Sequence, residues 1–223
     1  MRPYYESKGI TIYHGDCREI LPAIKCEAGS SLVSDPPYGI GYSSSSSRSV
    51  KAMARDHEVM IGDDKPFDPS WLLGMPWARK ILFGANHYAH LLPPSPCWIV
   101  WDKICGLKSN RPLGFNNSAD CELIWTDLDS PARIIRHTWI GMLKGSEREE
   151  TRDHPTQKPV YLMGKLIECL TPGGSPIVDP YAGSGTTLKA AKDLGRRAIG
   201  IEIEEKYCEI AVKRLAQEVL FTK

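Results

Sequence analysis

Residues 177–187 read Ile-Val-Asp-Pro-Tyr-Ala-Gly-Ser-Gly-Thr-Thr, and this stretch decides the fold. It begins as a short apolar strand, turns through two glycines and continues into a helical pattern over 186–194. Because Gly183 and Gly185 carry no Cβ, a nucleotide-type ligand can approach the backbone closely there. Taken alone, the pattern also fits an ordinary strand-to-helix turn. The sequence that follows the turn distinguishes the two.

An acidic residue ends the next predicted strand. Glu202 lies 23 residues after Asp179, close to the ~20-residue offset at which an acidic side chain binds ribose hydroxyls. A phosphate-binding loop would have a lysine after its second glycine, whereas Thr186 and Thr187 follow Gly185 directly. The turn and the acid together predict a site for an adenosine-type ligand without phosphates.

Strands and helices alternate outward from this turn. Short apolar runs predict strands at 10–13, 31–34, 80–83, 97–101, 121–126, 175–178 and 198–203, and apolar periodicity predicts helices at 160–170, 186–194 and 204–220. This alternation predicts an α/β fold with a mostly parallel sheet and helices on both faces. Residues 103–152 are charged and turn-rich, which predicts a small inserted region between two parts of one domain, 1–102 and 153–223.

A second turn carries a carboxylate. Residues 32–39 read Leu-Val-Ser-Asp-Pro-Pro-Tyr-Gly, so Asp35 follows a strand, at the edge where ligands bind in open α/β sheets. Pro36 and Pro37 stiffen the chain, leaving two acceptors, the Asp35 carboxylate and the Pro36 carbonyl. Such acceptors can bind both N–H groups of an exocyclic amine on a nucleobase, and Tyr38 offers a ring on which the base can stack. The alternative is a rigid loop with a core tyrosine.

Composition excludes several classes of protein. The 223 residues include 28 basic and 27 acidic side chains, a formal net charge of +1, so a nucleic acid would have to meet a local basic surface. The seven cysteines are scattered and indicate free thiols, and the only close histidine pair, His87 and His90, predicts a structural role and no metal. No apolar run is long enough to cross a membrane and no secretory signal is visible, which predicts a cytoplasmic protein.

The two turns together resemble those of DNA amino-methyltransferases that use S-adenosylmethionine, in which an Asp-Pro-Pro-Tyr catalytic motif accompanies a glycine-rich cofactor motif. The order found here, with the catalytic motif first, resembles the circularly permuted β class of that family. The segment 154–159, His-Pro-Thr-Gln-Lys-Pro, resembles a further cofactor motif of this class, and Gly15-Asp16 resembles its early acidic motif. The likeness covers residues 10–40 and 153–210 and implies a Rossmann-like methyltransferase fold.

The resemblance also implies roles for individual residues. The catalytic residues would be Asp35, Pro36, Pro37 and Tyr38. Glu202 would bind the ribose hydroxyls, Asp16 would lie near the adenine, and Lys158 would pair with the carboxylate of the cofactor, unless it is a solvated lysine at the start of a helix. The complete implied set of cofactor-binding residues is Asp16, Asp35, Thr156, Lys158, Asp179, Tyr181, Gly183, Ser184, Gly185, Thr186, Thr187 and Glu202.

The implied substrate is double-stranded DNA, and the implied product is N6-methyladenine in a restriction–modification context. Adenine is favoured because, in the family, aspartate at position 35 accompanies adenine more often and serine accompanies cytosine. N4-methylation of cytosine, methylation of RNA or a protein amide, and a non-catalytic DNA-binding protein with a relic site are the alternatives. The target sequence, a homodimer and a cognate restriction enzyme are left open. The candidate DNA contacts are Arg48, Lys51, Arg55, Lys108, Arg111, Arg133 and Arg136.

Overall fold

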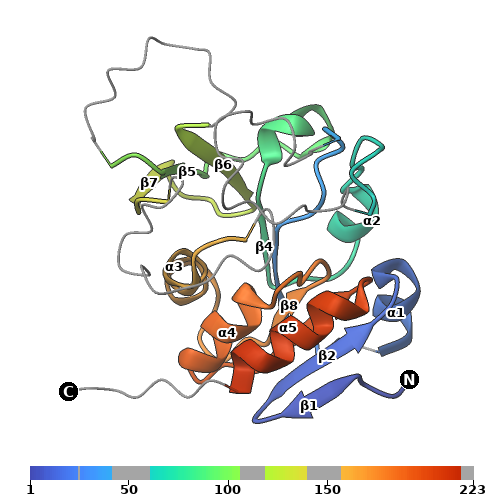
Figure 1. The fold of residues 1–223 in the computed structure, drawn as a ribbon. Coiled ribbons are helices and arrows are strands. Elements are labelled where there is room, and N and C mark those ends of the chain that lie inside the picture. The colour runs from blue at the N-terminus through green and yellow to red at the C-terminus, as the bar shows by residue number, and fades with distance from the viewer. Residues whose placement is uncertain (25, 42–60, 106–118, 140–156, 217–223) are drawn as a thin grey trace, which may run out of the picture.

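The computed structural model describes residues 1–24, 26–41, 61–105, 119–139 and 157–216, and the strands within them form one sheet (Figure 1). Across the sheet the order is β1-β2-β9-β8-β3-β4-β6-β5-β7. In chain order the strands are β1 (Tyr5–Ser7), β2 (Ile10–His14), β3 (Ser31–Ser34), β4 (Arg79–Leu82), β5 (Trp98–Asp102), β6 (Cys121–Thr126), β7 (Arg133–Arg136), β8 (Ile177–Asp179) and β9 (Ala198–Glu202).

The centre of the sheet is parallel. β2 pairs with β9, β9 with β8, β8 with β3 and β3 with β4, all in the parallel sense, while β1 and β6 run antiparallel to their neighbours. The carboxyl ends of β2, β9, β8, β3 and β4 therefore lie at one edge of the sheet. The predicted mostly parallel sheet is confirmed.

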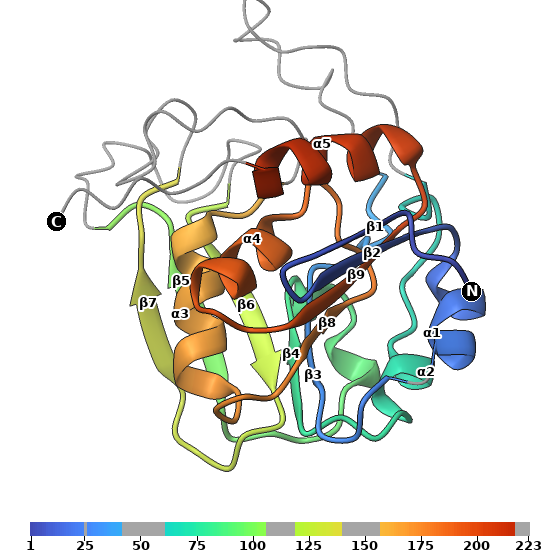
Figure 2. The same ribbon diagram turned by 90° about the horizontal axis from the view of Figure 1, so that it is seen from below.

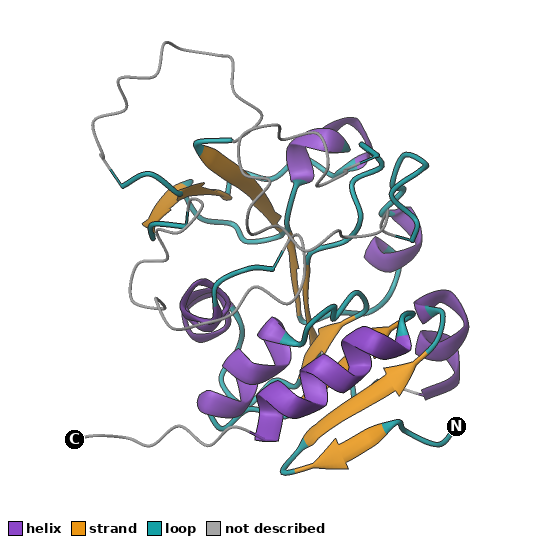
Figure 3. Ribbon diagram, in the orientation of Figure 1, coloured by secondary structure: helices purple, strands orange, loops and turns teal. Residues whose placement is uncertain are grey.

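Helices cover both faces of the sheet (Figures 2 and 3). On one face lie α3 (Val160–Leu170), α4 (Thr186–Asp193) and α5 (Glu205–Ala216); on the other lie α1 (Cys17–Ile24), α2 (Ser70–Leu73) and the short η2 (Ala85–His87) and η3 (Ala89–Leu91). Because side chains alternate along a strand, Val33 packs into the cluster under α3 and α4, and Leu32 packs into the cluster with α1 and α2.

The strand β7 was not expected from the sequence. Its residues, Arg-Ile-Ile-Arg, form the outermost strand next to β5, and Ile134 is 55% exposed there. A four-residue strand with arginine at each end has no clear apolar period, so only the sheet beside it makes the element recognisable.

Part of the expected inserted region, 103–152, is built into the sheet. β6 lies between β4 and β5, and β7 extends the sheet beyond β5. What remains for an insertion is 106–118 and 140–152, which lie outside the described residues. The predicted helix 204–220 is found as α5 up to Ala216, where the described chain ends. No helix in the described part of the chain is long and apolar enough to cross a membrane.

Candidate functional site

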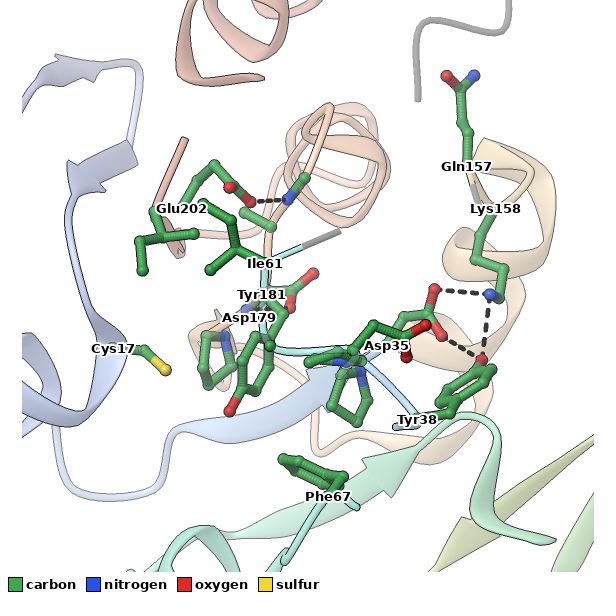
Figure 4. Close-up of a pocket in the computed structure, with 18 of the residues that line it drawn as sticks. Cys17, Asp35, Tyr38, Ile61, Phe67, Gln157, Lys158, Asp179, Tyr181 and Glu202 are labelled. Atoms are coloured by element: carbon green, nitrogen blue, oxygen red, sulfur yellow. Dashed lines mark hydrogen bonds and ion pairs between the residues drawn. The ribbon is translucent and has the colours of Figure 1, made fainter. Parts of the chain in front are cut away.

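A cavity of about 770 Å³ lies along the carboxyl edge of the parallel strands. Asp16 follows β2, Glu202 ends β9, Asp179 ends β8 and Asp35 follows β3, and all four line the cavity. This is the edge at which open α/β sheets bind ligands. The structure thus brings together four acids that the sequence separates by up to 186 residues, three of which are labelled in Figure 4.

The Asp35 carboxylate accepts two strong hydrogen bonds. The Tyr38 hydroxyl donates to Oδ1 at 2.5 Å and the Lys158 ammonium donates to Oδ2 at 2.6 Å (Figure 4). Burial raises the pKa of Asp35 and the Lys158 charge opposes that rise. The ammonium group therefore supports the ionised form of a carboxylate that is only 17% exposed.

A separate segment holds the turn after Asp35. The Gly39 N–H donates to Asp63 Oδ1 at 2.8 Å, and Asp63 is buried. Gly39 has φ +74°, and a Cβ at this position would lie 2.3 Å from the Lys65 carbonyl oxygen. Only glycine fits this close approach of the two backbones.

The Tyr38 ring is already packed. It stacks on the His87 imidazole, with ring centroids 5.0 Å apart and planes 15° apart. A Cβ at Gly84 would lie 2.0 Å from Tyr38 Cε1, so the ring also lies against the backbone there. His87 therefore covers part of the Tyr38 ring on which a base was expected to stack. His87, which the sequence suggested was structural, also lines the cavity.

Lys158 is bound by protein groups. Its side chain is 7% exposed and its Nζ lies 2.6 Å from Asp35 Oδ2, 3.3 Å from the Tyr38 hydroxyl and 3.4 Å from Glu122 Oε2. Burial opposes its charge, but Asp35 and Glu122 raise the pKa of Lys158 above its usual value. In this structure Lys158 is therefore a buried cation bound to protein carboxylates and not a solvated lysine, and it lines the cavity. A buried ammonium needs anionic partners, and sequence spacing cannot show which ones fold against it.

Asp179 accepts hydrogen bonds from neutral donors. Ser34 Oγ donates at 2.7 Å, Thr187 Oγ1 at 2.5 Å and the Tyr181 N–H at 3.1 Å. Burial raises the pKa of Asp179 to about 6, against which these hydrogen bonds act. The side chain thus ties together the end of β3, the glycine turn and the first turn of α4.

Glu202 holds the glycine turn through backbone amides. The Gly183 N–H donates to Oε2 (Figure 4), and the Glu204 N–H donates to Oε1, each at 2.8 Å. Each oxygen of a carboxylate has two acceptor sites, so one remains on each oxygen for a ligand hydroxyl. This is consistent with the ribose-binding role expected for Glu202.

The two glycines of the turn differ. Gly183 lines the cavity, with φ +50°. Gly185 does not line it, and a Cβ there would lie 2.7 Å from Ala211 Cβ on α5. At Gly185 the missing side chain lets α5 pack against the start of α4, whereas Gly183 is the glycine of the turn that lines the cavity.

The remaining predicted cofactor residues are placed as follows. Tyr181, Ser184, Thr186 and Thr187 line the cavity, and so does Asp16, whose Oδ1 accepts from the Arg18 N–H at 2.8 Å. Ser184 Oγ contacts Gln157 Oε1 at 3.3 Å, and Thr186 Oγ1 accepts from Arg214 at 2.8 Å. Thr156 lies outside the described residues.

The predicted DNA contacts fall into two groups. Arg133 and Arg136 lie exposed on β7, away from the cavity lining, and Arg136 Nε is 3.6 Å from Asp102 Oδ2. The other residues lie outside the described residues: Arg48, Lys51, Arg55, Lys108 and Arg111.

Sequence reasoning missed several residues of the site. Glu122, on β6, binds Lys103 at 2.9 Å and contacts Lys158. A charged residue within a predicted apolar strand was the available signal. Further cavity-lining residues that carried no motif are Asp63, Phe67, Trp101, Trp139 and Met163, and Gln157, within the segment 154–159, lines the cavity without having been assigned a role. Among the described residues no group of His, Cys, Asp or Glu side chains could hold a metal ion.

Comparison with known proteins identifies the family. The family model described as DNA methylase, covering N6 and N4 enzymes, matches residues 98–213. The Type II methyltransferase M2.DpnII of Streptococcus pneumoniae is 28% identical over 97% of this chain and 93% of its own, and M2.LlaDCHI of Lactococcus lactis subsp. cremoris is 28% identical over 96% and 92%.

Solved structures support the fold. The structure of M1.HpyAVI with SAM has a TM-score of 0.57 and 24% identity, covering 92% of this chain and all of that one. The cytosine-N4-specific PvuII DNA methyltransferase has a TM-score of 0.63 and 16% identity, covering 98% of this chain and 90% of that one. Because the DNA methylase model spans more than half of the sequence, the chain belongs to the N6/N4 family of S-adenosylmethionine-dependent DNA methyltransferases.

Proposed function

We propose that this chain is a β-class, circularly permuted enzyme that methylates the exocyclic N6 of adenine at a specific site in double-stranded DNA. The observation that carries the proposal is the single cavity shared by Asp35 and the glycine turn, which leave the adjacent parallel strands β3 and β8. The order of the two motifs along the chain is the order of the permuted class.

The donor set at the glycine-turn end fits S-adenosylmethionine. Glu202 retains acceptor sites for ribose hydroxyls, Asp16 lies farther along the same edge for the adenine, and Phe67 and Tyr181 provide aromatic walls in T-shaped contact at 5.8 Å. When bound, the cofactor supplies an electrophilic methyl group on a sulfonium. Asp35 and Asp179 also line the cavity, and their carboxylates favour a ligand that carries a positive charge.

Asp35 and the Pro36 carbonyl would act on the amine. The two acceptors bind the N–H groups, which favours a pyramidal nitrogen with its lone pair free. Lys158 and Tyr38 hold the carboxylate in place through hydrogen bonds of 2.6 and 2.5 Å. As the nitrogen gains its methyl group and becomes cationic, Asp35 is the acceptor placed for its proton.

DNA would be bound by basic segments that adjoin cavity-lining residues in the sequence. The segments 42–60, 106–118 and 140–156 each adjoin cavity-lining residues, namely Ile61, Ala119 and Gln157. They contain Arg48, Lys51, Arg55, Lys108 and Arg111. We assign target recognition to 106–118 and 140–152, with Arg133 and Arg136 of β7 as outlying phosphate contacts, in a cytoplasmic enzyme.

The experiment is to methylate double-stranded DNA with labelled cofactor, digest the product to nucleosides and identify the labelled nucleoside by mass spectrometry. N6-methyladenine supports the proposal. N4-methylcytosine would overturn the choice of base, since cytosine offers the same amine donors. Label in RNA or protein extracts but not in DNA would overturn the substrate, and DNA binding without transfer to any of them would indicate a relic site.

A further inference from the structure

The acidic residue Glu122 has no role in the proposed mechanism, yet it lies beside Lys158, which binds the catalytic turn. Its Oε1 accepts from the Lys103 ammonium at 2.9 Å. Its Oε2 is buried, lies 3.4 Å from Lys158 Nζ, and has no hydrogen-bond partner in the part of the chain that the structure describes. A buried carboxylate oxygen without a hydrogen bond is costly to keep.

Lys158 is thus held between two carboxylates. It donates to Asp35 at 2.6 Å and stands 0.8 Å farther from Glu122 Oε2, at 3.4 Å. Lys103, Glu122, Lys158 and Asp35 form a chain of alternating charge that runs from β5 and β6 to the turn after β3. A small movement of the ammonium group toward Glu122 would complete the missing hydrogen bond and release Asp35 Oδ2.

We propose that Glu122 is a positioning residue that acts on Asp35 through Lys158, by receiving the ammonium group when Asp35 engages the amine of the base. This inference rests on the proposed function of Asp35 as the amine acceptor. With Lys158 on Asp35, the carboxylate is held in place but is a weak proton acceptor. With Lys158 on Glu122, the same carboxylate is freed when the methylated nitrogen must lose a proton.

The charges around Asp35 determine in which direction each substitution should move the pKa of Asp35. The negative charge of Glu122 raises the pKa of Asp35, and Lys158 lowers it. The groups that face Asp35 from its surroundings are Lys158 before α3, Glu122 on β6, Tyr38 of its own turn, Tyr88 between η2 and η3, and Asp179 on β8. Removing the Glu122 charge therefore lowers the pKa of Asp35, whereas removing Lys103, which neutralises Glu122, raises it.

The variant Glu122→Gln tests the proposal. We expect the single-turnover rate to fall about tenfold while KM for DNA and cofactor stays within about twofold, and the acid limb of the pH–rate profile to move down by up to ~1 pH unit. Lys103→Met should move the same limb upward. Glu168→Gln removes an exposed carboxylate paired with Lys165 at 2.9 Å on α3, and this matched control should change neither rate nor limb.

A titration without substrate separates this inference from the proposed function. Carbon NMR of carboxyl-labelled aspartate, with Asp35→Asn to identify the signal, should show a lower Asp35 pKa in Glu122→Gln and a higher one in Lys103→Met. Glu122→Asp, which retains the charge, keeps the test valid if Glu122→Gln fails to fold, and should restore most of the rate. An unchanged Asp35 titration in folded Glu122→Gln would overturn the inference. So would a fall in rate accompanied by an equal rise in KM, with the acid limb of the pH–rate profile unmoved. Either result leaves the identity of the methylated base untouched.

Discussion

Two turns with almost the same sequence leave neighbouring strands and have different surroundings. Asp35-Pro36-Pro37-Tyr38 follows β3, and Asp179-Pro180-Tyr181 leaves β8. Asp179 is 2% exposed and accepts from two hydroxyls and a backbone N–H. Asp35 is more exposed, at 17% for its side chain, and accepts from an ammonium group and a phenol.

The difference in partners is consistent with a structural role for Asp179 and with the proposed catalytic role of Asp35. Short hydroxyl side chains and a backbone amide are fixed by the elements that carry them, so Asp179 holds those elements together. The ammonium group of Lys158 ends a long flexible side chain and has a second anion within reach. An aspartate before a proline therefore does not by itself indicate a role. The hydrogen-bond donors that bind its carboxylate distinguish the two turns.

The largest effect should come from Asp35→Asn, which keeps the shape of the turn but removes the anionic acceptor. We expect the rate of methyl transfer to fall by about 10³-fold, or ~4 kcal/mol of barrier, because general-base and electrostatic contributions are of this size. Cofactor affinity, measured by calorimetry on the same preparation, should change less than about threefold. A rate within about tenfold of the wild type would mean that Asp35 is not the catalytic acceptor.

Gly185→Ala should be the most damaging change in the scaffold turn. The new methyl group would lie 2.7 Å from Ala211 Cβ at φ +78°, so we expect a loss of about 2–4 kcal/mol in the free energy of unfolding. Gly195→Ala is the matched control, because φ is +66° and nothing lies within 4 Å of its Cβ. It should cost only the backbone strain of about 1 kcal/mol. Equal losses in urea unfolding would remove the packing explanation.

The pH dependence of the free energy of unfolding should reveal the raised pKa of Asp179. Native Asp179 has a pKa of about 6 against 3.8 for the unfolded chain, so the native state retains the proton longer. Between about pH 4 and pH 6 this group makes the free energy of unfolding decrease as pH rises, by up to about 3 kcal/mol. Asp179→Asn should remove that part of the slope. The comparison is of unfolding free energies of wild type and variant at a series of pH values; parallel curves would contradict a strongly raised Asp179 pKa.

The smallest effect expected is that of Tyr38→Phe. Loss of the 2.5 Å hydrogen bond to Asp35 Oδ1 should lower the methylation rate about tenfold, or ~1.4 kcal/mol, while the ring remains stacked on His87. Tyr4→Phe, next to the outermost strand β1 and outside the cavity lining, makes the same chemical change as a control. If the two variants have equal rates, the Tyr38 hydroxyl is not needed to hold Asp35.

The convergence of the site could be predicted from the sequence, but its internal contacts could not. Asp16, Asp35 and Glu202 each follow or end a predicted strand, and the carboxyl ends of parallel strands meet at one edge. The partner of Lys158 lies 123 residues away, and no local pattern encodes such a contact. Gly185 illustrates the same limit, because its need for glycine comes from Ala211 on a later helix.

The pairing of the early strands β2 and β3 with the late strands β9 and β8 constrains how this chain folds during synthesis. β9 and β8 lie between β2 and β3, so Ile10 pairs opposite Ala198 and Ser31 opposite Ile177. During synthesis β2 can pair with β1 and β3 with β4, but one edge of β2 and one edge of β3 stay unpaired until β9 and β8 have been made. Such long sequence separations slow folding, because the chain loses loop-closure entropy before the strand contacts that stabilise it can form. A ribosome-bound chain ending before residue 177 therefore lacks β8 and β9, the two strands that join β2 to β3 in the finished sheet.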